Sequence, residues 1–219
     1  MQRRSTGMDN MTTMNAPVKP DIQTYATLMK ELKLRTEVLT FFVTGKGNAL
    51  YQPPTVESCC LQIRKMLELI AFGSLVANKD IYSAAYAKFA THWHAGRLLR
   101  DLEKVNANFY PKPVVEVPSK QPGVVNELKE RGPDYLTKTD FEKLYDECGA
   151  IMHSRNPYSQ PIDYGWYQQQ LPPWRIKIVN LLNSHQVHLV NHPGFYLIHM
   201  KEENDDDVHY YEFAPAPKP

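Results

Sequence analysis

Residues 55–78 constrain the fold more than any other segment, because their apolar side chains surround a helix instead of following one face of it. The segment is rich in Leu, Ile, Met and Phe, and it follows the break Gln52-Pro53-Pro54. A helix that is apolar around much of its circumference is usually covered on several sides by its neighbours. The sequence therefore predicts that residues 55–78 form the central helix of a bundle.

Helical spacing of apolar side chains marks the other members of this bundle. It predicts helices over residues 21–43, 80–105, 140–153 and 174–183. Asp21 can cap the first of them, and Thr139 with Glu142 forms a capping box at the start of the third. We expect a mainly α protein built on a bundle of four to five helices.

The apolar period changes from helical to two over residues 186–213, where turns are expected near residues 191–194 and 203–207. This pattern predicts a C-terminal three-stranded antiparallel β-meander packed on the bundle, since an isolated ribbon is marginal in water. The proline-rich linker before it contains the extended run Val114-Val115-Glu116-Val117, which can pair at a sheet edge. Residues 125–131 are expected to form a short turn of helix.

These patterns divide the chain unevenly. We predict a disordered N-terminal arm over residues 1–20, a helical bundle domain over residues 21–185, the β-meander over residues 186–213 and a loose tail over residues 214–219.

The charge balance limits the ligands that the chain can hold. Lys and Arg together number 25 against 24 Asp and Glu, which gives a formal net charge of +1 at pH 7. No global field therefore exists to hold a polyanion non-specifically, and a nucleic-acid role must use a local patch.

Cysteine usage and the lack of a signal sequence indicate a reduced compartment. The three cysteines are odd in number, and Cys59 and Cys60 are adjacent, a spacing that disfavours a thiolate zinc site. The first residues are polar and lack the apolar region of a secretory signal. The longest apolar stretch, residues 61–77, includes Arg64 and Glu68 and so cannot cross a bilayer as a bare helix. We expect a cytoplasmic protein with no membrane partner.

Three charged residues interrupt the central helix along one narrow stripe. At about 100° per residue, Glu57, Arg64 and Glu68 fall within roughly 40° of one another, and Arg64 can pair with Glu68 one turn away. One interpretation is a partly solvated face with a structural salt bridge. The other is a polar pocket or subunit interface, because Leu61 and Leu69 share the same arc and buried charges need a facing group.

A second polar cluster lies where the helix of residues 140–153 ends. His153 is followed closely by Arg155, Asn156 and Tyr158. An imidazole can transfer protons near neutral pH, and Arg155 can hold a phosphate in a bidentate fork, so His153 is a candidate facing group for the stripe. The alternative is structural, since a histidine at a helix C-terminus stabilises the dipole and an Asn-Pro pair ends a helix.

The remaining histidines do not predict a metal site. His92 and His94 project about 200° apart on a helix, so they cannot share a metal ion. His188 could converge with His199 or His209 across neighbouring strands, but semi-exposed alternating strand positions are the favoured interpretation. No metal and no cofactor is predicted.

Two short stretches carry patterns that occur together in one family of helical domains. Residues 61–68 read Leu-Gln-Ile-Arg-Lys-Met-Leu-Glu, and residues 148–153 read Cys-Gly-Ala-Ile-Met-His, followed by Arg155-Asn156-Pro157. The first resembles the Arg-Lys-x-Leu-Glu helix of HEPN-like (higher eukaryotes and prokaryotes nucleotide-binding) domains, and the second is similar to their late helix that ends in histidine. The similarity spans about residues 55–158. It implies an antiparallel bundle of four or five helices that often dimerises and is frequent in bacterial defence and toxin systems.

Active members of that family are metal-independent ribonucleases, and this sequence departs from their pattern. They carry an arginine with four to six residues between it and the histidine, whereas Asp146, Glu147 and Cys148 stand at those positions here. None of these three can bind phosphate or stabilise charge on the scissile group. Arg64 or Arg155 would have to substitute for that arginine in space.

The resemblance implies binding of RNA or a nucleotide, with metal-independent endoribonuclease activity in a bacterial or phage defence or toxin–antitoxin system. The candidate catalytic residues are His153 as general acid/base, with Arg64 and Arg155 as phosphate-holding groups. The candidate binding or orienting residues are Glu57, Glu68, Asn156 and Tyr158. The alternative is a catalytically inactive interaction or assembly module that works through homodimerisation or through a protein partner.

Overall fold

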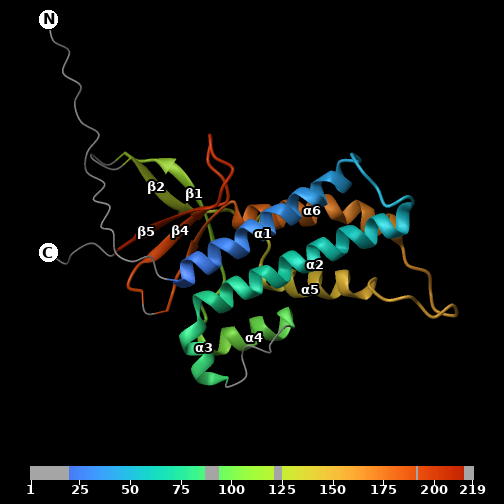
Figure 1. Ribbon diagram of the computed structural model, residues 1–219, viewed down its shortest axis with the longest axis horizontal. Coiled ribbons are helices and arrows are strands. Elements are labelled where there is room, and N and C mark those ends of the chain that lie inside the picture. Colours follow the sequence, from blue (N-terminus) through green and yellow to red (C-terminus); the bar gives the residue numbers. More distant parts are fainter. Residues whose placement is uncertain (1–19, 87–93, 121–124, 191, 215–219) are drawn as a thin grey trace, which may run out of the picture.

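The computed structural model describes residues 20–86, 94–120, 125–190 and 192–214. Within them the chain forms six α-helices and five β-strands (Figure 1). The helices are α1 (Pro20–Val43), α2 (Gln52–Ala77), α3 (Lys79–Ala85), α4 (Ala95–Val105), α5 (Lys138–Ala150) and α6 (Tyr164–Leu182). The strands are β1 (Lys112–Pro118), β2 (Asn126–Glu130), β3 (Ser184–Val187), β4 (Phe195–His199) and β5 (His209–Phe213). Nearly all of the expected N-terminal arm and C-terminal tail lies outside the described residues.

Helix α2 is the centre of the helical layer. Its buried side chains include Ile63, Met66 and Ile70, and α1, α3, α4, α5 and α6 all contact it. In Figure 1, α1 and α2 run side by side along the long axis of the molecule. Gly73 permits this close approach, because a β-carbon there would lie 2.9 Å from the Tyr25 ring. Neighbouring helices therefore cover α2 on several sides, as its apolar circumference requires.

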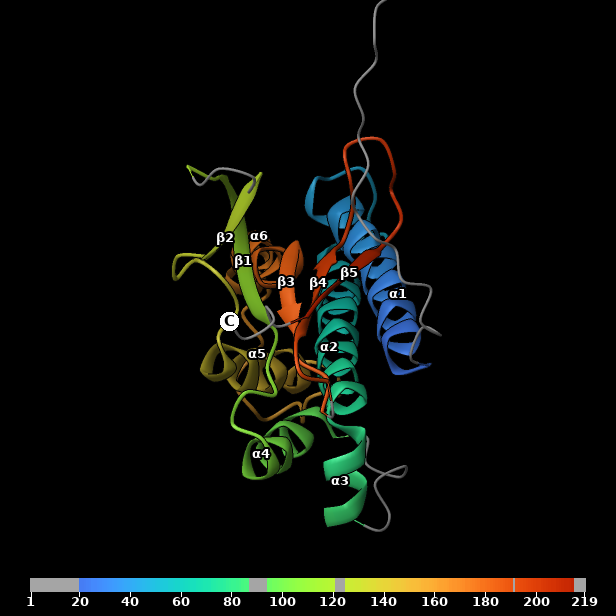
Figure 2. The same ribbon diagram turned by 90° about the vertical axis from the view of Figure 1, so that its left-hand side faces the viewer.

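A five-stranded antiparallel sheet lies at one end of the helices, with the strand order β2-β1-β3-β4-β5 (Figure 2). The prediction of a helical bundle with a three-stranded C-terminal meander is therefore wrong. The three C-terminal strands are antiparallel neighbours, but β1 and β2, from the linker and the residues after it, extend the same sheet.

Strand β1 lies between β2 and β3 instead of at a sheet edge, and the predicted helical turn of residues 125–131 is strand β2. Val115 of β1 stands opposite Lys129 of β2. Pairing with β1 satisfies backbone N–H and C=O groups that would otherwise need other partners. This tertiary contact overrides the helix preference of Glu127, Leu128 and Lys129.

Residues 80–105 do not form the single helix that their spacing predicts. Helix α3 ends at Ala85, Tyr86 has extended backbone, and α4 begins after His94. The His94 ring caps α4 by accepting a 3.3 Å hydrogen bond from the Arg97 N–H. A local cap therefore starts a new helix inside a continuous apolar pattern.

Helix α5 begins and ends earlier than predicted. The hydroxyl of Thr137, and not of Thr139, caps it by accepting a 3.1 Å hydrogen bond from the Asp140 N–H. The helix ends at Ala150, so His153 lies in the loop between α5 and α6 and not in the last turn of the helix.

Helix α6 is longer than predicted, because it continues through Pro172 and Pro173. Asp163 caps it by accepting a 2.9 Å hydrogen bond from the Trp166 N–H. Each proline lacks the N–H that would bond the carbonyl four residues earlier. Those carbonyls belong to residues 168–169, which are exposed, so water can satisfy them.

A buried hydrogen-bond chain joins the sheet to α1. The Tyr25 hydroxyl lies 2.7 Å from His185 Nε2, and His185 Nδ1 lies 2.7 Å from the Leu182 carbonyl oxygen. Because a carbonyl only accepts, Nδ1 carries the hydrogen and Nε2 accepts from Tyr25. Burial lowers the pKa of His185 to about 4, so the ring is neutral at neutral pH.

A helix that spans a bilayer needs about 20 consecutive, predominantly apolar residues. Even α2, the longest helix, includes Arg64, Lys65 and Glu68. No helix among the described residues is both long enough and apolar enough to span a membrane.

Candidate functional site

The polar stripe on α2 faces other helices, and tyrosines cover it. Arg64 donates two hydrogen bonds to Tyr145 of α5, one of 2.7 Å to the hydroxyl and one of 3.2 Å to the carbonyl. Its guanidinium carbon lies 3.9 Å from the centroid of the Tyr145 ring, and Glu68 forms a 3.7 Å ion pair with it. A β-carbon on Gly149 would lie 2.6 Å from an Arg64 nitrogen, so the glycine makes room for the guanidinium. Arg64 therefore holds α2 against α5, and Glu68 pairs with it from within α2.

Glu57 lies on the same stripe, about 10 Å from Arg64 along the helix axis towards the start of α2, in a separate pocket. Its carboxylate accepts a 2.6 Å hydrogen bond from the Tyr164 hydroxyl of α6, and this bond raises the pKa of Tyr164 to about 12. His153 and Arg155, from the loop between α5 and α6, line the same pocket. We call this cavity of about 440 Å³ the loop pocket.

The loop pocket brings Glu57, His153 and Arg155 together and leaves the other predicted site residues out. The side chain of Asn156 builds the loop, because its oxygen accepts a 3.0 Å hydrogen bond from the Tyr158 N–H. The Tyr158 side chain is 96% exposed and lies outside the pocket lining.

The chemistry of the loop pocket suits an anion with hydroxyl or amino groups. Arg155 donates one 3.1 Å hydrogen bond to the Gln160 carbonyl. A guanidinium has five N–H donors, so others can reach a phosphate oxygen. The exposed ring of His153 supplies another donor, and the free oxygen of Glu57 can accept from a hydroxyl or an amino group.

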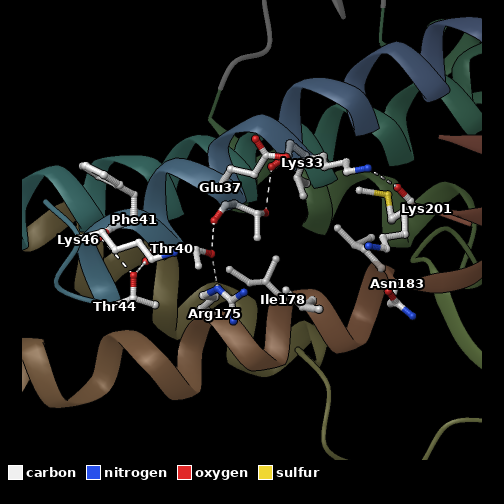
Figure 3. Close-up of a pocket in the computed structure, with 15 residues that line it drawn as sticks. Lys33, Glu37, Thr40, Phe41, Thr44, Lys46, Arg175, Ile178, Asn183 and Lys201 are labelled. Carbon is white, nitrogen blue, oxygen red and sulfur yellow. Dashed lines mark hydrogen bonds between the residues drawn. The ribbon is translucent and has the colours of Figure 1, made fainter. Parts of the chain in front are cut away.

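A larger groove, of about 530 Å³, runs between α1 and α6 (Figure 3). Leu32, Ile178 and Leu182 are buried side chains that line it and give it an apolar floor. We call it the α1–α6 groove. The sequence did not predict it.

A row of threonines forms one wall of the α1–α6 groove. Thr36, Thr40 and Thr44 donate hydrogen bonds of 3.0, 2.6 and 2.8 Å to carbonyls one turn earlier in α1. Their hydrogens are used within the helix, so their oxygens are left to accept. Arg175 of α6 uses one of them, donating a 2.7 Å hydrogen bond from Nε to the Thr40 hydroxyl (Figure 3).

The sheet contains a cluster of histidines and carboxylates. His199 of β4 stands opposite His209 of β5, so two of the histidines considered for a metal do meet on neighbouring strands. His199 Nε2 lies 2.7 Å from a Glu116 oxygen, and His209 Nε2 lies 3.1 Å from an Asp205 oxygen. In the part of the chain that the structure describes, no group of three or more His, Cys, Asp or Glu is arranged to hold a metal ion. His92 lies outside the described residues.

Sequence reasoning missed the groups that face the polar stripe and the groove. Tyr145 and Tyr164 cover the stripe, and neither belongs to a motif that would mark it. The four-residue spacing of Thr36, Thr40 and Thr44 could have indicated a polar wall on α1. Its partner Arg175 could not be assigned, because it lies 135 residues away from Thr40 in the sequence.

Comparison of the chain with protein-family models, with curated proteins and with solved structures gave no match in any of the three. The membership in the HEPN-like family that the two motifs imply therefore stays a prediction.

Proposed function

We propose that this chain binds RNA or a nucleotide in the loop pocket. One observation carries the proposal: Glu57 of α2 is distant in sequence from His153 and Arg155, yet all three line a single polar pocket with Tyr164. Its volume of about 440 Å³ lies within the range of small-ligand sites. The resemblance to HEPN-like domains implies the same class of ligand.

The parts of a nucleotide match the groups around the loop pocket. Arg155 and His153 would hold the phosphate, and Glu57 would accept from a ribose hydroxyl or a base amino group. Tyr158 is almost fully exposed beside the pocket-lining segment, so its ring offers a surface on which a base can stack. Arg155 places a local positive charge in the pocket, whereas the net charge of +1 for the whole chain supplies no general field.

The geometry favours binding over cleavage. Arg64 was expected to hold phosphate beside His153, but its guanidinium is engaged by Tyr145 and Glu68. Among the residues that line the loop pocket, His153 is the one imidazole and Arg155 the one guanidinium. We therefore propose that the loop pocket can bind RNA without cleaving it.

The test is the affinity for a short fluorescein-labelled single-stranded RNA, measured by fluorescence anisotropy. Arg155→Ala should weaken binding about tenfold or more, because it removes a charge-assisted hydrogen bond to phosphate. His153→Ala should weaken it severalfold. Arg97→Ala is the matched control, since Arg97 is an exposed arginine of α4 outside the loop pocket.

Unchanged affinity in Arg155→Ala, or an equal loss in Arg97→Ala, would refute the loop pocket as the binding site. The same samples on a denaturing gel test cleavage. RNA fragments that form with the wild type and not with His153→Ala would add ribonuclease activity to binding.

A further inference from the structure

Phe41 is an exposed apolar side chain that lines the α1–α6 groove, and other exposed apolar side chains lie on the same two helices. Leu34, Val38 and Phe41 of α1 are 58%, 41% and 49% exposed, and Ile176 of α6 is 51% exposed. Leu34, Val38 and Phe41 are four and three residues apart, so they share one exposed apolar face of α1, and Phe41 joins that face to the groove. Exposed apolar surface of this kind marks interaction sites.

The groove is also cationic. Lys33, Lys46, Arg175 and Lys201 line it, against a single lining carboxylate, that of Glu37. Lys33 is neutralised by a 2.8 Å ion pair with Asp206. Among the described residues, no carboxylate forms an ion pair with the other three cations. Once Glu37 is counted, two of these positive charges stay without a carboxylate in the groove lining to balance them.

The shape of the groove selects the secondary structure of its occupant. Both walls are helices, whose backbone groups already bond within each helix, so an added strand would find no edge to pair with. From Leu32 to Thr44 the α1 wall is about 18 Å long, which equals about three turns of helix. Side chains of a third helix can enter a groove between two others.

We infer that the α1–α6 groove is a docking site for an amphipathic helix of a partner protein whose polar face is acidic. Its apolar face packs on Phe41 and Val179, which line the groove without being fully buried. Its carboxylates face Lys46, Arg175 and Lys201 (Figure 3). This surface is separate from the loop pocket, so the inference does not depend on RNA binding.

The experiment uses the full chain and two synthetic helical peptides of about fourteen residues. Both place Leu on one face, and the other face carries Glu in the first peptide and Lys in the second. The acidic peptide should bind about tenfold more tightly than the basic one, as two unpartnered charges at about threefold each imply. Equal binding of the two peptides, or no binding of the acidic one, would overturn the inference.

Single variants locate the binding. Lys46→Ala and Arg175→Ala should each weaken the acidic peptide about threefold, whereas Lys129→Ala on the edge strand β2 should not. Glu37→Gln should tighten binding about threefold, and a gain cannot arise from misfolding. A groove variant that changes RNA affinity, or a Glu37→Gln protein with unchanged peptide affinity, would count against a separate acidic-helix site.

Two further measurements exclude other occupants. If laurate binds to the protein and neither peptide does, the groove holds a small amphiphile. If sedimentation shows a dimer that Leu34→Asp separates into monomers, a second copy of the chain covers the groove. Either result would overturn the inference.

Discussion

The guanidinium of Arg64 donates a 2.7 Å hydrogen bond to the Tyr145 hydroxyl and lies 3.9 Å from the centroid of the same ring. One charged side chain thus uses both the polar and the aromatic parts of Tyr145. Because the contact joins α2 to α5, Arg64 contributes to the packing of two helices. It is not free to hold a ligand in the loop pocket.

Arg64→Ala should therefore lower the free energy of unfolding by about 2 kcal/mol, the usual effect of losing a partly buried hydrogen bond from a charged group. Tyr145→Phe keeps the ring and removes only the hydroxyl, so its effect should be smaller, about 1 kcal/mol. Urea unfolding measures both. RNA affinity should be unchanged in the folded Arg64→Ala protein. A variant with full stability and lost RNA binding would instead put Arg64 in the ligand site.

The buried Tyr25–His185 pair predicts a pH dependence of stability. The pKa of His185 falls from about 6.5 in the unfolded chain to about 4 in the folded protein. The unfolded chain therefore binds one more proton between these pH values. Stability from the neutral ring is complete above about pH 6.5 and is lost as the pH falls towards 4, by about 1.4 kcal/mol per pH unit and about 3 kcal/mol in total.

Urea unfolding of the wild type and of His185→Gln between about pH 7 and pH 4.5 tests this dependence. The glutamine variant should be less stable at neutral pH, and its stability should fall less steeply on acidification. Other groups titrate in both proteins, so the difference between the two slopes isolates His185. Equal slopes would show that His185 does not have a lowered pKa.

The central helix could be predicted from the sequence because its signal is local. Periodicity within residues 55–78 shows which side chains need cover, whatever their partners are. The sheet could not be predicted in the same way. Strand β1 pairs with β3 through Pro113 and His185, residues distant in sequence, and β2 contains helix-forming residues that only the pairing with β1 holds extended.

The same distinction applies to the candidate site. His153 and Arg155 lie two residues apart, so their proximity follows from the chain itself. The stripe of Glu57, Arg64 and Glu68 followed from helix geometry, but its facing groups are tertiary contacts. The expected pairing of Arg64 with His153 did not anticipate Tyr145. Tyr145 lies closer to the middle of α5 and accepts hydrogen bonds from the Arg64 guanidinium.

The start of α5 makes a prediction that separates two neighbouring threonines. Thr137→Ala should destabilise the protein by about 1 kcal/mol, because it removes the cap that accepts from the Asp140 N–H. Thr139→Ala should have almost no effect, since Thr139 is exposed within the helix. Thermal unfolding of the two variants decides which threonine is the cap. A larger destabilisation by Thr139→Ala than by Thr137→Ala would identify Thr139 as the cap.

The three thiols should be unreactive in the folded protein. Cys59, Cys60 and Cys148 are all buried. Burial raises the pKa of Cys59 to about 12, and a hydrogen bond with Cys60, together with burial, raises the pKa of Cys148. Since the thiolate is the reactive form, Ellman's reagent should label none of them quickly at about pH 8 and all three after unfolding in guanidinium. Fast labelling of the native protein would contradict the packing of α2 against α5.

The most direct test of nucleotide binding in the loop pocket is a map of where RNA touches the protein. A short RNA containing 4-thiouridine can be crosslinked to the full chain by light, and the crosslinked peptides can be identified by mass spectrometry. Binding in the loop pocket predicts crosslinks within residues 151–164, and their loss in Arg155→Ala. Crosslinks confined to another surface, such as α4 around Arg97 and Arg100, with none in residues 151–164, would contradict it.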